Sequence, residues 1–407
     1  MPSLNELVGE QKMKSDIKSI PFRHRYLQSQ VVGPAQSNGY IRFTLPRANA
    51  GYLDVSTLRF RGLLNVDTVD ASARLAGHDA SILIDRVRVV AGSSVIFDQE
   101  HNQLISNSTN ANFDVTDIDY QNYERALSDY PQDQSRISQV QTAHTADRIC
   151  IFRLGPQGSF LNQNALIPLE GMKDVLHIDL YFSNPSECFL STDTALTYTF
   201  QKPELNWMAL YSQSLDMHYS RSVVSYHSTN YGHRYNQIQS GTSQVNLSIP
   251  SNSSNVSGII TFVRDQTMNT GSDITKEKLE NCFYNATEYE QSDFRIATKS
   301  IYDEPLGPDI NEYYAQLHHQ FPEISTSRHI TPVGFQGNQF IHAVNLSGAP
   351  TQYTRNLVSG VRSSILNTDM HLQIRFKNPT TVTLQLDHYV ISDVVYSFAN
   401  GRITLDL

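Results

Sequence analysis

The residues of this sequence that are able to do chemistry are scattered rather than grouped. His318 and His319 are adjacent, so on a helix the two imidazoles would point in different directions instead of sharing one metal ion. Asp114, Asp117 and Asp119 form an acidic cluster that resembles a calcium site, but the loop glycine and the distal glutamate of such a site are missing. A solvated acidic loop is the simpler interpretation.

Enzyme signatures are missing as well. The sequence contains no HExxH, GxSxG, GxxxxGK[ST] or GxGxxG motif. A metal-binding cupin needs an HxH pair on one strand, but His177 is followed by Ile-Asp and His371 by Leu-Gln. We therefore predict no catalytic, cofactor-binding or metal-binding residues, no cofactor and no enzyme activity.

The composition favours a large all-β protein. The 407 residues suggest two domains; 39% are hydrophobic, only 17% are charged, and 21 Tyr and 18 Phe are present. Aromatic residues favour strands, whereas the abundant Asn and Ser favour turns. No run of about 18 apolar residues could span a bilayer, and the charged N-terminus is unlike a signal peptide. We expect a soluble protein made in a cytosol.

Charge and cysteine content exclude further classes. A net charge of −9 is unsuited to a nucleic-acid surface, which needs a basic face, so we predict no sequence-specific nucleic-acid binding. Cys150, Cys188 and Cys282 are odd in number and lack CxxC spacing, which predicts buried free thiols.

Two strand patterns occur twice. LHIDLYFSNP (176–185) matches HLQIRFKNP (371–379), with apolar residues at every second position and an Asn-Pro turn at the end. IRFTLP (41–46) matches VNLSIP (245–250), and each is followed by a polar turn and a second strand. The offsets of 194 and 204 differ as loop insertions would make them differ.

The closing segments also correspond, at 195–211 and 381–398. We therefore predict two tandem β-sandwiches, although all antiparallel sandwiches share some strand–turn repetition. Long polar insertions at 101–138 and 268–328 interrupt the two halves, and they include helical candidates DITKEKLENCFYN and PDINEYYAQLHHQF, the second capped by Asp309.

These doubled segments, with the C-terminal LDHYVISDVVYSFANGRITLDL, resemble the double jelly-roll major capsid proteins of tailless icosahedral DNA viruses. The resemblance covers most of 39–407 and consists of strand patterns rather than a chemical signature. It implies an N-terminal arm (1–38), a first jelly roll (39–212) and a second jelly roll (213–407). Within the arm, Leu4, Leu7, Val8 and Met13 are compatible with a short amphipathic helix or with a frayed terminus.

The resemblance further implies a structural role in the virion. Three chains would form a homotrimeric capsomer with a pseudo-hexagonal outline, because two rolls per chain supply six similar sides. Its partners would be neighbouring capsomers, penton and minor capsid proteins, and an internal membrane reached through the arm, with the insertions as towers and contacts. The alternative is a two-sandwich glycan-binding or host-attachment protein, since Tyr- and Asn-rich loops suit sugars.

Overall fold

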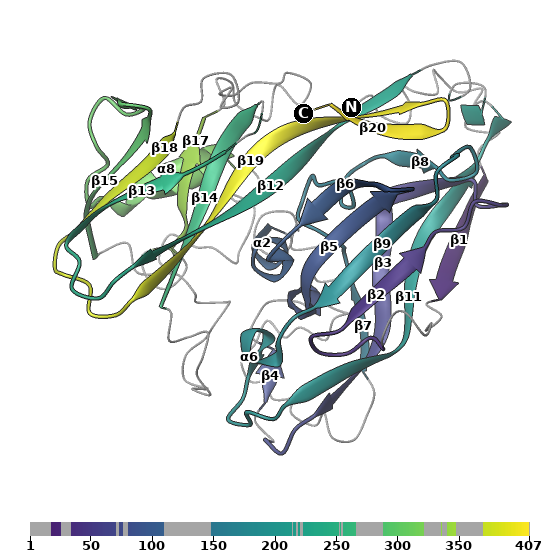
Figure 1. Ribbon diagram of the computed structural model, residues 1–407, viewed down its shortest axis with the longest axis horizontal. Coiled ribbons are helices and arrows are strands. Elements are labelled where there is room, and N and C mark those ends of the chain that lie inside the picture. The colour runs from purple at the N-terminus through teal and green to yellow at the C-terminus, as the bar shows by residue number, and fades with distance from the viewer. Residues whose placement is uncertain are drawn as a thin grey trace.

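The computed structural model describes residues 18–25, 34–70, 73–75, 80–109, 148–213, 223–251, 255–265, 288–320, 340–346 and 369–406, with a few single residues between these ranges. Two β-sandwiches lie side by side, the first at the right and the second at the left of Figure 1. The all-β prediction is confirmed. Among the described residues, no helix combines the length and the apolar character needed to cross a bilayer.

Each sandwich has one sheet of long strands and one sheet of shorter strands. In the first sandwich, the long-strand sheet has the order β1 (Lys18–Arg25), β11 (Thr197–Tyr211), β3 (Tyr52–Asp67), β7 (Arg148–Phe152), and β8 (Leu166–Pro168) also pairs with β3. The short-strand sheet has the order β2 (Tyr40–Thr44), β9 (Leu176–Phe182), β5 (Ile84–Ala91), β6 (Ser94–Gln99).

The second sandwich repeats this arrangement. Its long-strand sheet has the order β12 (Val224–Ile238), β19 (Leu384–Ala399), β14 (Val256–Asp265), β17 (His342–Asn345), and β20 (Arg402–Asp406) pairs with β19. Its short-strand sheet has the order β13 (Gln244–Ile249), β18 (Met370–Phe376), β15 (Tyr289–Ile296), β16 (Lys299–Ser300). The position of every strand in the four-strand orders therefore has an equivalent in the other sandwich.

The predicted duplication extends to the pairing of individual residues. Ile41 pairs with Leu180 in the first sandwich, and Val245 pairs with Ile374 in the second. These two pairs are related by the offsets 204 and 194 that the sequence patterns gave. A shift of one residue would have turned the apolar side chains outward, so the agreement fixes the register of both strands.

An irregularity of the backbone is repeated too. In the first sandwich, the ladder between β5 and β9 has a bulge between Ile84 and Arg86. In the second, the ladder between β15 and β18 has one between Tyr289 and Gln291, 205 residues further along. β-Bulges bend a strand and are kept within related folds, so the shared bulge is a stronger sign of common topology than strand number alone.

The alternation seen in the sequence produces the cores. In β9 and β18 every second side chain is buried against the facing sheet, as period-2 patterning requires. These core residues are Leu176, Ile178, Leu180, Phe182, Met370, Leu372, Ile374 and Phe376. The predicted burial of both terminal phenylalanines is confirmed.

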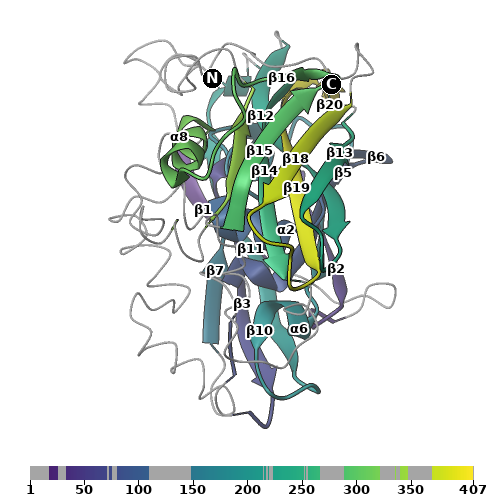
Figure 2. The ribbon, with the colours of Figure 1, turned by 90° about the vertical axis from the view of Figure 1, so that its left-hand side faces the viewer.

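Four short helical segments and one small ribbon complete the fold. The helical segments are η1 (Ala80–Leu83), α2 (Asn102–Ser108), α6 (Pro185–Cys188) and α8 (Ile310–Gln320), and the ribbon pairs β4 (Arg74–Leu75) with β10 (Phe189–Leu190). α8 confirms one helical prediction: the Asp309 carboxylate accepts from the Asn311 N–H at 2.9 Å, and Tyr313 and Leu317 are buried. Figure 2 shows α8 on the flank of the second sandwich.

The N-terminal segment differs from the expected arm. Residues 18–25 form β1, which pairs with β11 along its whole length. The physical reason is local, because the Phe22 ring stacks on Trp207 with centroids 4.6 Å apart and ties this stretch to the first sandwich. The amphipathic segment around Leu4 and Met13 lies outside the described residues, as do the candidate helix at 273–285 and most of both long insertions.

Candidate assembly surfaces

The residues weighed as metal ligands do not converge. His318 is half-buried and His319 is exposed on α8. Asp114, Asp117 and Asp119 lie outside the described residues. Over the ranges that the structure describes, no three His, Cys, Asp or Glu side chains are grouped closely enough to hold a metal ion.

The histidine strands carry a polar ladder on the outer face of the sheet. In the first sandwich, both Asp179 oxygens accept from the Arg42 guanidinium, at 2.6 and 2.7 Å, and the Asp179 side chain is fully buried. The His177 ring contacts the Thr44 hydroxyl at 3.0 Å. These pairs join β2 to β9 and are structural. The sequence gave a signal for them, since the IRFTLP and LHIDLYF strands were expected to be neighbours.

Two of the three cysteines confirm the thiol prediction. Cys150 on β7 and Cys188 in α6 are buried and free. Cys282 lies outside the described residues.

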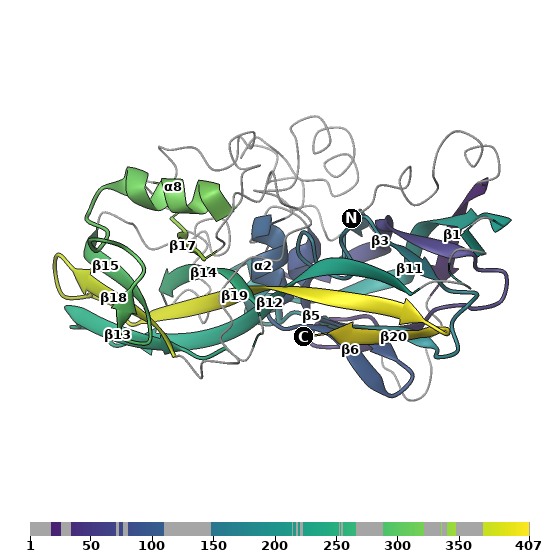
Figure 3. The ribbon, with the colours of Figure 1, turned by 90° about the horizontal axis from the view of Figure 1, so that it is seen from above.

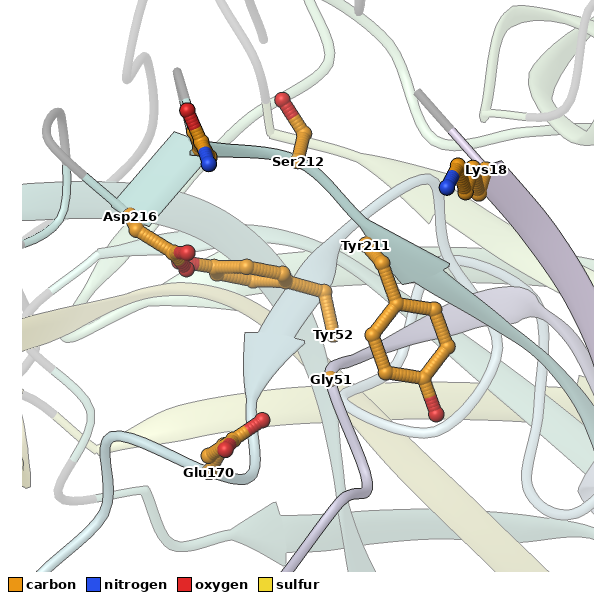
Figure 4. Close-up of a pocket in the computed structure, with 8 residues that line it drawn as sticks. Lys18, Gly51, Tyr52, Glu170, Tyr211, Ser212 and Asp216 are labelled. Atoms are coloured by element: carbon orange, nitrogen blue, oxygen red, sulfur yellow. The ribbon is translucent and has the colours of Figure 1, made fainter. Parts of the chain in front are cut away.

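A small polar pocket opens near the start of β1. Its volume is about 240 Å³, and its lining includes Lys18, Glu170 and Tyr211. Figure 4 shows Tyr52 directed towards Asp216 across it, and the Tyr52 hydroxyl donates to the Asp216 carboxylate at 2.7 Å. Burial and this carboxylate raise the pKa of Tyr52 well above its usual range, so its hydroxyl stays protonated and acts as a donor.

The two sandwiches are joined by an aromatic cluster. The Phe160 ring lies 4.7 Å from Tyr396, 6.2 Å from Tyr226 and 6.3 Å from Phe97. The Tyr396 hydroxyl also donates to the Ile96 carbonyl at 3.1 Å. Because Phe97 and Phe160 belong to the first sandwich and both tyrosines to the second, one continuous apolar core crosses the junction.

At the same junction, the first sandwich covers the outer edge of β12. The Gly158 carbonyl accepts from the Thr229 N–H at 2.8 Å and from the Ser228 hydroxyl at 3.1 Å. The Tyr231 hydroxyl donates to the Gln157 carbonyl at 2.9 Å. Gly158 has a φ of +75°, and a Cβ there would lie 3.0 Å from the Thr229 hydroxyl, so glycine permits this close approach.

The C-terminal hairpin forms a second connection. β20 lies beside β6 of the first sandwich in Figure 3. The Gly401 carbonyl in the turn before β20 accepts from the Lys173 N–H at 2.7 Å. Gly401 has a φ of +75°, and an added Cβ would lie 2.6 Å from the Gly171 carbonyl oxygen. The hairpin is therefore seated against the first sandwich.

A charged cluster lies beside the aromatic one, and the sequence gave no sign of it. Asp387 is buried, accepts from the His233 ring at 2.9 Å and from the Arg264 guanidinium at 2.8 Å. Burial acts to raise the pKa of Asp387, but the Arg264 charge and the His233 hydrogen bond outweigh it and hold that pKa well below its usual range. The His101 ring, from the first sandwich, lies 4.3 Å from His233. Asp387 thus stays ionised and orders this side of the junction.

Comparison with known proteins supports the architecture. No family model and no curated protein sequence matches the chain. Similar solved structures include VP54 of PBCV-1, with a TM-score of 0.68, 11% identity and 98% of each chain covered. The Faustovirus major capsid protein gives 0.63 and 8%, covering 94% of this chain and 91% of that one, and the mavirus major capsid protein gives 0.55 and 11%, covering 97% and 90%. Along nearly its whole length, the chain has the double jelly-roll fold of viral major capsid proteins.

Proposed function

We propose that this chain is the major capsid protein of a tailless icosahedral DNA virus, with a structural rather than an enzymatic role. The observation that carries this proposal is the repetition of strand order, register and bulge in two sandwiches held by one shared core. A rigid pair of equivalent rolls makes half of a problem that symmetry completes: three copies present six similar sides and fill a sixfold lattice site.

The partners follow from this role. The chain would assemble with itself into a homotrimer, and the trimers with neighbouring capsomers, penton proteins and minor capsid proteins in the virion. The chain before β1 would contact an internal membrane or minor proteins beneath the shell. Synthesis would take place in the host cytosol.

The test is the mass of the purified full-length protein in solution. Sedimentation equilibrium at micromolar concentration should give three times the 45.9 kDa of one chain. Permanent interfaces of this kind bury well over about 2,000 Å², so dissociation on dilution should be slow. A stable monomer would count against the capsid role and favour the glycan-binding alternative, and electron micrographs of native material should show particles if the proposal holds.

A further inference from the structure

The long-strand sheets of the two sandwiches begin with equivalent edge strands. β1 pairs only with β11, and β12 pairs only with β19. Inside the chain, the outer edge of β12 is covered by the first sandwich through Gly158 and Thr229. The outer edge of β1 has no neighbouring strand in the part of the chain that the structure describes. One of two equivalent edges is therefore covered and the other is open.

The open edge is fixed in place and basic. Phe22 anchors β1 on Trp207, while Ile20 is 49% exposed, and Lys18 and Arg23 are exposed too. The strand carries basic residues and no Asp or Glu. An ordered, uncovered strand edge is a template for pairing with another chain, and proteins usually protect such an edge.

The fold indicates which part of a second copy would cover this edge. In the first sandwich, the covering surface includes β6 and the residues just after it, where Ile96 and His101 contact the second sandwich. The strand equivalent to β6 is β16, and residues 301–309 follow it. This segment contains Asp303 and Glu304, both exposed, and neither Lys nor Arg occurs from 301 to 320.

The two surfaces also face apart, as a head-to-tail contact requires. In Figure 1, β1 lies at one end of the long axis, and β15, which leads into β16, lies at the other. A single chain therefore cannot join them. A second copy can, because its acidic segment and the basic edge of β1 are complementary in charge.

We propose that the outer edge of β1 docks on residues 301–309 of a second copy, so that the junction seen inside the chain recurs between chains. This inference rests on the proposed function and adds its interface. Such a contact is heterologous, and it closes into a ring when each copy contributes two rolls and three copies supply six equivalent junctions.

A charge exchange in the full chain tests the contact. Arg23→Glu should raise the concentration at which half of the trimer dissociates by at least tenfold, measured by sedimentation velocity over a dilution series. Adding Asp303→Arg and Glu304→Arg to that variant should return the value towards wild type, because the charges are then opposite again. Lys377→Glu, at an exposed turn of the second sandwich, is the matched control and should dissociate like wild type. Circular dichroism and the unfolding midpoint should be unchanged in all variants.

The outcomes separate the two ideas. If the wild type is a trimer and Arg23→Glu dissociates at the same concentration, the β1 contact is wrong and the capsid proposal stands. If Arg23→Glu dissociates but the exchanged variant is not restored, the acidic segment is not the partner and the inference is overturned. A monomeric wild type contradicts the proposed function itself.

Discussion

Phe182 and Phe376 occupy the same position in the two sandwiches. Each ends its central strand, each is 3% exposed, and each pairs with the residue that precedes the shared bulge, Ile84 or Tyr289. Two phenylalanines 194 residues apart in sequence thus close the same corner of two cores.

Truncating either ring should be costly. Phe182→Ala and Phe376→Ala should each lower the free energy of unfolding by about 3–5 kcal/mol, because each leaves a cavity in a close-packed core. Denaturant unfolding followed by fluorescence measures the loss. Val69→Ala, at a residue that is 90% exposed, is the control and should change stability by less than about 0.5 kcal/mol. Losses below about 1 kcal/mol for both phenylalanines would contradict the assigned register.

Acid should destabilise the second sandwich through its buried histidines. His342 has no hydrogen-bond partner and His388 contacts the Thr261 hydroxyl at 2.7 Å; burial lowers the pKa of His342 to about 4 and that of His388 to about 3. The unfolded chain binds these protons near pH 6.5 and the folded chain does not, so stability is lost as the pH falls below about 6.5.

The variant His342→Phe isolates one of these groups. Its ring would fit among Tyr289, Tyr313 and Phe340, whose centroids lie 5.4–6.3 Å from that of His342. The stability difference between pH 7 and pH 4 should shrink by roughly 3 kcal/mol relative to wild type, measured by urea unfolding at each pH. An unchanged difference would mean that His342 is protonated equally in both states.

Removing one partner of the buried ion pair should cost more than removing both. Arg42→Ala leaves the Asp179 carboxylate buried without its bidentate donor, and the expected loss is about 2–3 kcal/mol, moderated because the Arg42 side chain is 39% exposed. The double variant with Asp179→Ala should recover part of that loss in a double-mutant cycle. A double variant as unstable as the sum of the single variants would show that the two residues do not interact.

Two glycines with similar backbones offer a matched comparison. Gly401 and Gly241 have φ values of +75° and +86°, but nothing lies within 4 Å of an added Cβ at Gly241. Gly241→Ala should therefore cost only the backbone strain, about 1 kcal/mol. Gly401→Ala should cost at least about 2 kcal/mol and speed proteolysis of the C-terminal hairpin, because its Cβ would meet the Gly171 carbonyl. Equal effects would mean that the hairpin is not seated there.

Strand positions were predictable wherever one face is buried and the other is not. The alternation around Leu180 and Ile374, with the Asn-Pro turns, marked two equivalent strands and their register, and Asp309 marked the start of α8. These features depend on short-range patterns, which a sequence displays directly.

Edge strands and the junction escaped prediction for physical reasons. β1 shows only exposed or half-buried positions, so it lacks the pattern of a core strand, and it is held by Trp207 from far along the chain. Phe160 and Gly158 lie in a loop whose role is set entirely by the other sandwich. Asp387 looked like any strand residue until Arg264 and His233 were placed beside it.

In each sandwich the first strand pairs with the last long one, so that Lys18 faces Tyr211 and Val224 faces Phe398. During translation, β1 must wait for almost two hundred residues before its partner leaves the ribosome, and β12 waits nearly as long. Such non-local closure slows folding and leaves sticky intermediates exposed. Efficient production of this chain should therefore depend on the chaperones of the cell that makes it.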